Sequence, residues 1–159
     1  MSTDTADTAV WLGEDEMAAW LPFIRIVQAL PQQLDRLLRE EAGIPHNYYG
    51  MLATLSAQPD RTLTMGDLAR LTASSPSRLS HAIAALEQRG WVERRQCPED
   101  KRMQYATLTD AGLELLRSVA PRHVAHVRSL VFDRLTPEQV RQLAEISSAI
   151  VGDADLGEA

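Results

Sequence analysis

Four polar side chains lie close together in the middle of the chain, at a spacing that suits hydrogen bonding to one extended ligand. Ser75 precedes Pro76, and Ser77, Arg78 and His81 follow it. His81 lies one helical turn beyond Ser77, so the two side chains share a face of a helix. A guanidinium donates to the paired acceptors of guanine, and hydroxyl groups reach phosphate or base atoms. These residues therefore indicate a surface that binds a polyanion through hydrogen bonds.

A second group of basic residues lies in and just before the polar segment 96–102. Lys101 and Arg102 lie at the end of this segment, and Arg94 precedes it. Basic side chains at a loop tip can follow a phosphate backbone, and a guanidinium is attracted into a narrow minor groove. Arg94 and Arg95 alternate along an expected strand and so face opposite ways. We expect at most one of them to face the polyanion and the other to pair with an acidic neighbour.

Charge is distributed unevenly along the chain. The 159 residues have a net charge of −6, but the segment from Arg61 to Arg102 holds eight basic and five acidic residues and is +3, which leaves −9 for the rest. A basic middle between acidic flanks indicates an anionic partner that binds this segment, or else a solvated basic face.

Two short helices, a tight turn and a β-hairpin must position these residues. Thr64 precedes a short apolar run and stands three residues before Asp67, which is the spacing of a capping box. Ser75 is a preferred N-cap residue, and Gly90 is a suitable helix end. The expected elements are helices from Thr64 and from Ser75 to Gly90, a turn at 72–74, and strands at 91–95 and 103–108.

Longer amphipathic helices are expected at both ends of the chain. One covers 14–41 and ends at Gly43, with a kink or break at Pro22 and Pro31. The apolar stripes of the C-terminal helices are longer than one small lobe would cover, so we expect self-association about a two-fold axis. An intramolecular bundle is the alternative. The remaining expected helices cover 45–57, 109–131 with a bend at Pro121, and 136–150.

Several short motifs occur in a fixed order between residues 67 and 112. They are Asp67-Leu68-Ala69, Leu79, Leu86-Glu87, Gly90-Trp91-Val92-Glu93-Arg94, Asp100-Lys101-Arg102, and Leu108-Thr109 with Gly112. In order and spacing they resemble the signature of the MarR family of transcription regulators, and the resemblance covers 44–150. It implies a helix-turn-helix whose second helix lies in the major groove, followed by a wing.

The resemblance also implies a homodimer and assigns roles to single residues. Arg102 is implied to be the wing arginine, supported by Asp100. The complete expected DNA interface is Thr64, Ser75, Ser77, Arg78, His81, Arg94, Lys101 and Arg102.

The expected fold is mainly α with a small β-hairpin wing, a winged helix-turn-helix flanked by N- and C-terminal dimerisation helices. The domain limits are a disordered tail at 1–12, dimerisation helices at 13–43 and 109–152, and the DNA-binding lobe at 44–108. The expected function is a sequence-specific repressor of transcription that binds a pseudo-palindromic duplex and is released by a small aromatic or phenolic ligand. The alternatives are an interaction module without DNA binding and an oxidant sensor that acts through Cys97.

Aromatic residues gather in the first two expected helices. The family often binds small aromatic anions between its dimerisation helices and the DNA-binding lobe, and aromatic walls with a cationic partner suit such a ligand. Core packing is the alternative interpretation, above all for Trp20 and Tyr48. The expected ligand pocket is Trp20, Phe23, Arg25, His46 and Tyr49.

The sequence contains no pattern of a catalytic or metal site. A Gly-rich phosphate loop, a Gly-x-Ser-x-Gly elbow and a Cys/His cluster are all absent, so we expect neither an enzyme nor a cofactor. His123 and His126 are interpreted as a surface pair rather than one side of a metal site. A single cysteine, and the lack of a signal peptide or a bilayer-length apolar run, favour a cytoplasmic protein.

Overall fold

The computed structural model describes residues 11–100 and 102–153. The chain divides after Gln33 into two compact parts, which are described separately. The expected tails at 1–10 and 154–159, and the wing residue Lys101, lie outside the described residues. The helices and the small β-sheet confirm the expected fold class, mainly α with a β-hairpin.

The first part, residues 11–33, is dominated by helix α1 (Glu14–Ala42), which continues into the second part. The helix passes through Pro22 and Pro31, so of the two expected outcomes, a kink or a break, the break is wrong. Each proline removes one backbone donor and leaves a carbonyl four residues earlier without its usual partner. Ala18 and Val27, which carry these carbonyls, are exposed. Water can therefore satisfy them, and the helix need not end.

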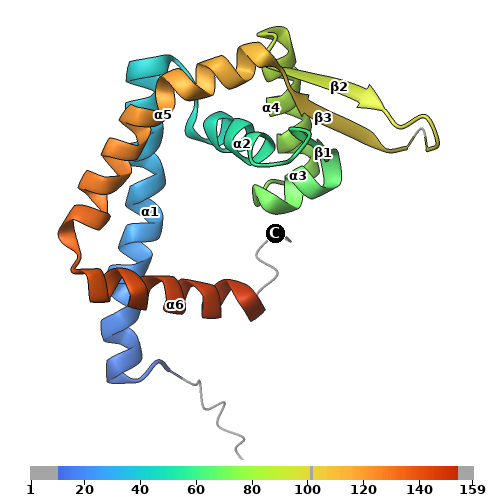
Figure 1. Cartoon of the computed structure of the whole chain (residues 1–159). Helices are drawn as coiled ribbons and strands as arrows, with labels where there is room; N and C mark the ends of the chain where they lie inside the picture. The colour runs from blue at the N-terminus through green and yellow to red at the C-terminus, as the bar shows by residue number, and fades with distance from the viewer. Residues whose placement is uncertain (1–10, 101, 154–159) are drawn as a thin grey trace, which may run out of the picture. The chain divides into compact units, whose positions relative to one another are not determined.

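In the second part, residues 34–153, four helices pack around one hydrophobic core (Figure 1). They are α2 (His46–Ser56), α3 (Met65–Leu71), α4 (Pro76–Gln88) and α5 (Asp110–Leu130). Each contributes the apolar positions that recur at helical spacing, as the periodicity predicts. The buried core residues are Met51, Leu52, Leu55, Leu68, Leu79, Ala82, Ile83, Leu86, Val92, Ala106, Leu108 and Leu116.

A three-stranded antiparallel sheet lies beside these helices, with the strand order β1-β3-β2. Strands β2 (Val92–Gln96) and β3 (Gln104–Leu108) form the expected hairpin. Strand β1 (Thr62–Thr64) was not expected. Its three residues pair with β3, and the Thr62 and Thr107 hydroxyl oxygens lie 2.8 Å apart. A strand this short forms only because β3, a distant segment of the chain, supplies backbone hydrogen-bond partners.

The caps of the helices confirm the expected boundaries. Thr64, Ser75 and Thr109 are the N-caps of α3, α4 and α5, and each side chain accepts a hydrogen bond from a backbone N–H of the first turn. Gly43 and Gly90 follow α1 and α4 with φ values of 66° and 73°. This left-handed conformation costs glycine little and ends both helices.

Two helical elements complete the chain, a 3₁₀ turn (Phe132–Arg134) and helix α6 (Pro137–Asp153). Helix α5 continues through Pro121, and α6 begins at the expected Thr136-Pro137 boundary. No residue of α6 whose side chain is described is buried, although Leu143, Ile146 and Ile150 are apolar. Within the described residues, none of the helices combines the length and apolar character that crossing a bilayer requires.

Candidate nucleic-acid interface

Helix α4 divides its side chains between the core and the solvent. Leu79, Ile83 and Leu86 are at most 1% exposed and fix the inner face of the helix. The predicted contact residues Ser77, Arg78 and His81 are all exposed. The spacing of the buried residues therefore places these polar side chains together on the outer face of the first turns of α4. The sequence placed them correctly, because burial alternates along a helix with a fixed period.

The turn between α3 and α4 is held by local hydrogen bonds. The Thr72 hydroxyl donates to the Leu68 carbonyl at 2.7 Å, and the Ser74 amide donates to the Ala69 carbonyl at 2.9 Å. Ala73 has a φ of 47°, which is unusual for a residue with a Cβ. Ser75 then caps α4, because its Oγ accepts from the Arg78 amide at 3.4 Å. The exposed face of α4 therefore starts at a fixed point.

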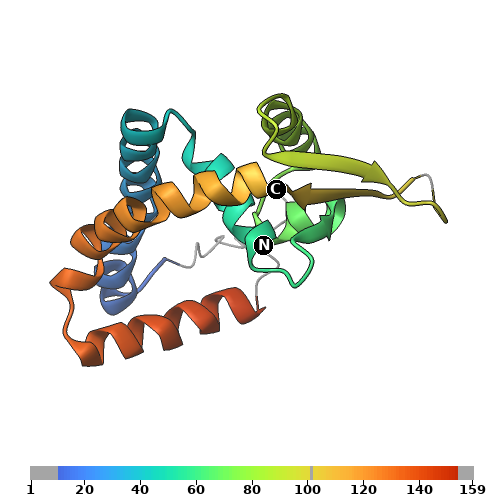
Figure 2. The ribbon, with the colours of Figure 1, turned by 45° about the horizontal axis from the view of Figure 1, so that its top comes forward.

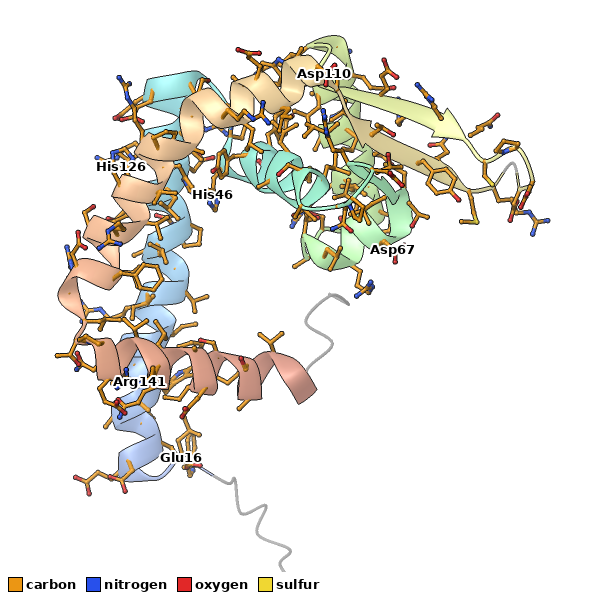
Figure 3. All side chains as sticks on the ribbon, in the orientation of Figure 1. Glu16, His46, Asp67, Asp110, His126 and Arg141 are labelled. Carbon is orange, nitrogen blue, oxygen red and sulfur yellow. The ribbon has the colours of Figure 1, made fainter. Side chains whose placement is uncertain are left out.

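The side chain of Thr64 forms its hydrogen bonds within the protein. Its hydroxyl oxygen accepts from the Asp67 amide at 3.0 Å, and its hydroxyl donates to Asp67 Oδ2 at 2.8 Å. The hydrogen bond from Thr64, followed by that from Arg70, lowers the pKa of Asp67, which lies at the start of α3 (Figure 3). The geometry thus gives Thr64 a capping role, and the DNA contact expected of it remains a prediction.

The hairpin from Val92 to Leu108, called the wing below, projects beyond the helices of this part of the chain (Figure 2). At its tip Arg102 is exposed, as the sequence predicts. Asp100 supports the tip through the main chain: its Oδ1 accepts from the Arg102 amide at 2.9 Å, and its carbonyl accepts from the Met103 amide at 2.9 Å. The backbone of Arg102 is therefore held, while its side chain extends into solvent.

The two arginines on strand β2 are both paired with carboxylates. Arg94 contacts Glu87 of α4, with Nε donating to Oε2 at 2.6 Å. Arg95 contacts Glu93 on its own strand at 3.1 Å. The sequence predicts Arg94 in the DNA interface and does not indicate Glu87 as its partner. The six residues between them include the end of a helix and the start of a strand, so spacing alone gave no signal.

Cys97 lies at the tip of the wing and is half-buried. Its amide donates to the Met103 carbonyl at 2.9 Å, which closes the tip. The pKa of the Cys97 thiol is lowered, first by the backbone N–H of Asp100 and then by that of Glu99, because both donate to the thiolate. A thiol with a lowered pKa is the chemical requirement for modification at neutral pH.

The five residues expected to line a ligand pocket fall on both parts of the chain. In residues 11–33, the Trp20 and Phe23 rings are 6.2 Å apart and tilted by 44°. Arg25 lines a shallow hollow of about 340 Å³ there. In residues 34–153, His46 and Tyr49 both lie on α2 and are half-buried.

His46 and Tyr49 meet His123 of α5, which sequence reasoning interpreted as one of a surface pair. That interpretation is wrong for His123. Its ring lies 4.2 Å from the Tyr49 ring and 5.7 Å from the His46 ring, and its Nδ1 is buried without a hydrogen-bond partner. Burial lowers the pKa of both His46 and His123. The neighbouring His126, labelled in Figure 3, instead pairs with Glu41 of α1, with Nε2 3.6 Å from Oε1.

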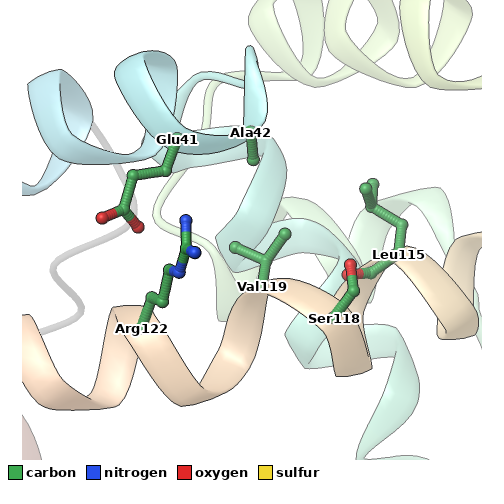
Figure 4. A pocket seen from close by; sticks show the side chains of 6 residues that line it. All are labelled: Glu41, Ala42, Leu115, Ser118, Val119 and Arg122. Carbon is green, nitrogen blue, oxygen red and sulfur yellow. The ribbon is translucent and has the colours of Figure 1, made fainter.

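A pocket of about 330 Å³ lies between the end of α1 and helix α5. Glu41 and Arg122 point toward one another across the pocket, and Val119 and Leu115 form an apolar wall of it (Figure 4). Its lining residues are Glu41, Ala42, Leu115, Ser118, Val119 and Arg122.

Comparison with known proteins places this arrangement among transcription regulators. The model of the MarR family matches residues 42–103. The structure is similar to Sco3205, a MarR family transcriptional regulator from Streptomyces coelicolor solved in complex with DNA, with 49% identity, a TM-score of 0.85 and coverage of 91% of each chain. It is also similar to AbsC, a MarR family transcriptional regulator from the same organism, with 38% identity, a TM-score of 0.83, and coverage of 91% of this chain and 97% of that chain. A curated relative, the transcriptional repressor MprA of Escherichia coli (strain K12), is 28% identical over 126 residues, which are 79% of this chain and 70% of the relative.

Proposed function

The chain belongs to the MarR family, and from this premise we propose that it is a homodimeric transcription regulator that binds duplex DNA. The observation that carries the proposal is the exposed polar face at the start of α4, next to a wing that presents Arg102. The similarity to Sco3205, which was solved with DNA, supports the same partner for this chain. An enzymatic role has no support from these relatives, which are regulators of transcription.

Helix α4 is the element proposed to read sequence. An α-helix fits the major groove of B-DNA, which is about 12 Å wide, and the N-terminal side chains of such a helix reach the base edges. Arg78 can donate two hydrogen bonds to one guanine. Ser77 and His81 share a face and can donate to bases or phosphates. The short helix α3 then crosses the backbone, as in other helix-turn-helix proteins.

The wing is proposed to contact the adjacent minor groove or backbone. The exposed side chain of Arg102 is attracted there by the negative potential, which is strongest in narrow A·T tracts. Lys101 is assigned to the same contact from the sequence alone. The excess of positive charge in the segment 61–102 favours an approach of DNA to this side of the wing lobe, which we define as residues 44–108.

The flanking helices, residues 13–43 and 109–152, are proposed to form the dimer. Apolar side chains on α1 and α6 remain exposed in the single chain, among them Phe23, Ile26, Ile146 and Ile150. Large apolar side chains that recur along a helix face and stay exposed are typical of an interface, and a two-fold dimer is its commonest form. Such a dimer predicts two DNA half-sites about 10 bp apart, related as a palindrome.

The sign of regulation is proposed to be repression, relieved by a small aromatic or phenolic acid. The name of the relative MprA supports repression. The cluster of Tyr49, His46 and His123 supports ligand binding in the second part of the chain, because it joins aromatic faces to a buried ring nitrogen without a partner. A ligand that favours another spacing between the two wing lobes of the proposed dimer would lower DNA affinity. Calorimetry that detects neither heat nor competition across a panel of such acids would exclude this form of relief.

A second candidate function, oxidant sensing through Cys97, is favoured by the lowered pKa of its thiol. Oxidation or alkylation at the wing tip would place a new group next to Arg102. Treatment with iodoacetamide is therefore expected to weaken DNA binding by the natural protein and to leave a Cys97→Ser variant unaffected. Full labelling of Cys97 with unchanged DNA affinity would count against a sensor role.

Selection of bound duplexes from a random pool tests the proposed function directly. A palindromic consensus is expected, and its affinity should fall steeply with salt, because each neutralised phosphate releases counterions. A pool that yields no consensus at low salt would favour an interaction module without DNA binding.

A further inference from the structure

The carboxylate of Glu87 holds the Arg94 side chain and main chain at once. Oε1 accepts from the Arg94 amide at 3.0 Å. Oε2 accepts from Nε at 2.6 Å and also lies 2.6 Å from Nη2. Both oxygens of one carboxylate are therefore engaged by one residue, and the Arg94 guanidinium is bound through two of its nitrogens.

The position of this pair in the fold gives it a structural task. Glu87 lies in the last turn of α4, and Arg94 is the third residue of β2. Arg94 pairs in register with the buried Ala106, and it shares a face of the strand with the buried Val92. Among the described residues, no other ion pair joins α4 to the wing.

A neighbouring pair on the same strand shows what distinguishes this one. Glu93 and Arg95 contact each other at 3.1 Å with side chains 56% and 73% exposed, and both belong to β2. The side chains of Glu87 and Arg94 are only 29% and 33% exposed and come from two elements. Exposed pairs within one element add little, whereas partly buried contacts between elements restrict how the elements can move.

We propose that Glu87 and Arg94 are positioning residues that fix the wing relative to α4, so that Arg102 reaches the DNA while α4 occupies the major groove. This inference rests on the proposed function. It assigns Arg94 a role through Glu87 and the wing, in place of the direct DNA contact expected from the sequence.

Whether one substitution raises or lowers DNA affinity distinguishes a direct DNA contact of Arg94 from a positioning role. Glu87→Gln removes a negative charge close to the proposed DNA surface and weakens the hold on Arg94, because an amide has one acceptor oxygen where the carboxylate has two. If Arg94 contacts DNA, or if only charge matters, the variant should bind DNA more tightly, because repulsion of phosphates is reduced. If the pair positions the wing, the variant should bind about tenfold more weakly, as is typical for coupled residues.

Glu93→Gln is the matched control, because it removes the same charge from the opposite face of β2. We expect it to bind the selected duplex as tightly as the natural protein or slightly more tightly. Arg94→Lys is a second variant that keeps the charge but loses the planar, two-nitrogen contact. It should also bind about tenfold more weakly, and loss of positive charge cannot explain that result.

A double substitution tests whether the pair acts through the wing. In an Arg102→Ala background the wing has lost its arginine contact, so adding Glu87→Gln should change DNA affinity by less than about twofold. Additive losses would indicate general disruption of the lobe and would overturn the inference. Thermal unfolding of each variant, monitored by circular dichroism, accompanies the affinities.

Other outcomes are also decisive. If Glu87→Gln binds as tightly as Glu93→Gln, or if Arg94→Lys binds like the natural protein, the pair does not position the wing. If the natural protein itself binds no duplex, the proposed function fails instead. The natural protein, measured in the same series, therefore distinguishes the two failures.

Discussion

At the scale of single residues, the partners of each polar side chain decide which of the predicted contacts the geometry supports. The Thr64 side chain is hydrogen-bonded to Asp67, and the Arg94 side chain is hydrogen-bonded to Glu87. Ser77, Arg78 and Arg102 are exposed and extend from fixed backbone. The sequence identified all of these as polar residues near one surface. It could not assign their partners, because those depend on side chains that folding brings close.

Arg102→Ala is expected to weaken DNA binding about tenfold and to leave folding and dimerisation unchanged, because the side chain is exposed and the tip is held by its backbone. The slope of log affinity against log salt should decrease by about one for each wing. Arg117→Ala on α5 removes the same charge from an exposed position outside the wing and is the control. Equal affinities for the two variants would argue against the wing contact.

The half-buried His123, whose Nδ1 has no hydrogen-bond partner, predicts a pH dependence of stability. Burial lowers its pKa below the ordinary value of about 6.5. As pH falls through about 6.5, the unfolded chain takes up a proton that the folded chain resists, so the free energy of unfolding decreases. Burial of His46 acts in the same direction, while the nearby Asp35 opposes it.

Urea unfolding of the natural protein at a series of pH values between about 5 and 8 measures this effect. His123→Phe keeps a ring against Tyr49 and should reduce the loss of stability on acidification. The same substitution at the exposed His81 is the control for removal of one imidazole. A His123→Phe variant with the pH profile of the natural protein would contradict the assignment.

At the scale of elements, the start of α5 is fixed to the turn between α4 and β2 by a close backbone approach. The Thr109 amide donates to the Trp91 carbonyl at 3.0 Å, and the Thr109 hydroxyl donates to the Gly90 carbonyl at 2.7 Å. Gly112 lies over the same carbonyl, and a Cβ there would be 2.3 Å from the Trp91 oxygen. Only glycine fits, which explains its place in the motif that follows the wing.

Gly112→Ala is therefore expected to lower the free energy of unfolding by about 3 kcal/mol, because backbone must shift to admit the methyl group. Gly50→Ala is the matched control: that position lies inside α2, and an added Cβ meets no atom within 4 Å. The control should be about 0.5–1 kcal/mol more stable than the natural protein. Chemical denaturation measures both, and an unchanged Gly112→Ala variant would refute the steric argument.

At the scale of the whole molecule, a single chain leaves apolar surface on its terminal helices that a dimer would cover. Ile146 is 58% exposed on α6, and Ile150 is 45% exposed one turn later. Placing a charge in such an interface leaves it without water or a partner, which costs several kcal/mol.

Ile146→Glu is accordingly expected to weaken dimerisation by about a hundredfold or more, as measured by sedimentation equilibrium. DNA affinity should fall with it, because a monomer reaches only one half-site. Ser147→Glu introduces the same charge at the neighbouring, polar position of α6 and controls for charge alone. Two variants with the same association constant would place the interface elsewhere.

The sequence by itself determined the helices, their caps and the outer face of α4, because these depend on periodicity and on hydrogen bonds between residues close in the chain. Tertiary structure decided the pairing of β1 with β3, the contact of Glu87 with Arg94 and the packing of His123 against Tyr49. These contacts join segments that are distant in sequence or cross from one element to another. Packing of the core brings them together, and local residue patterns carry no record of that packing.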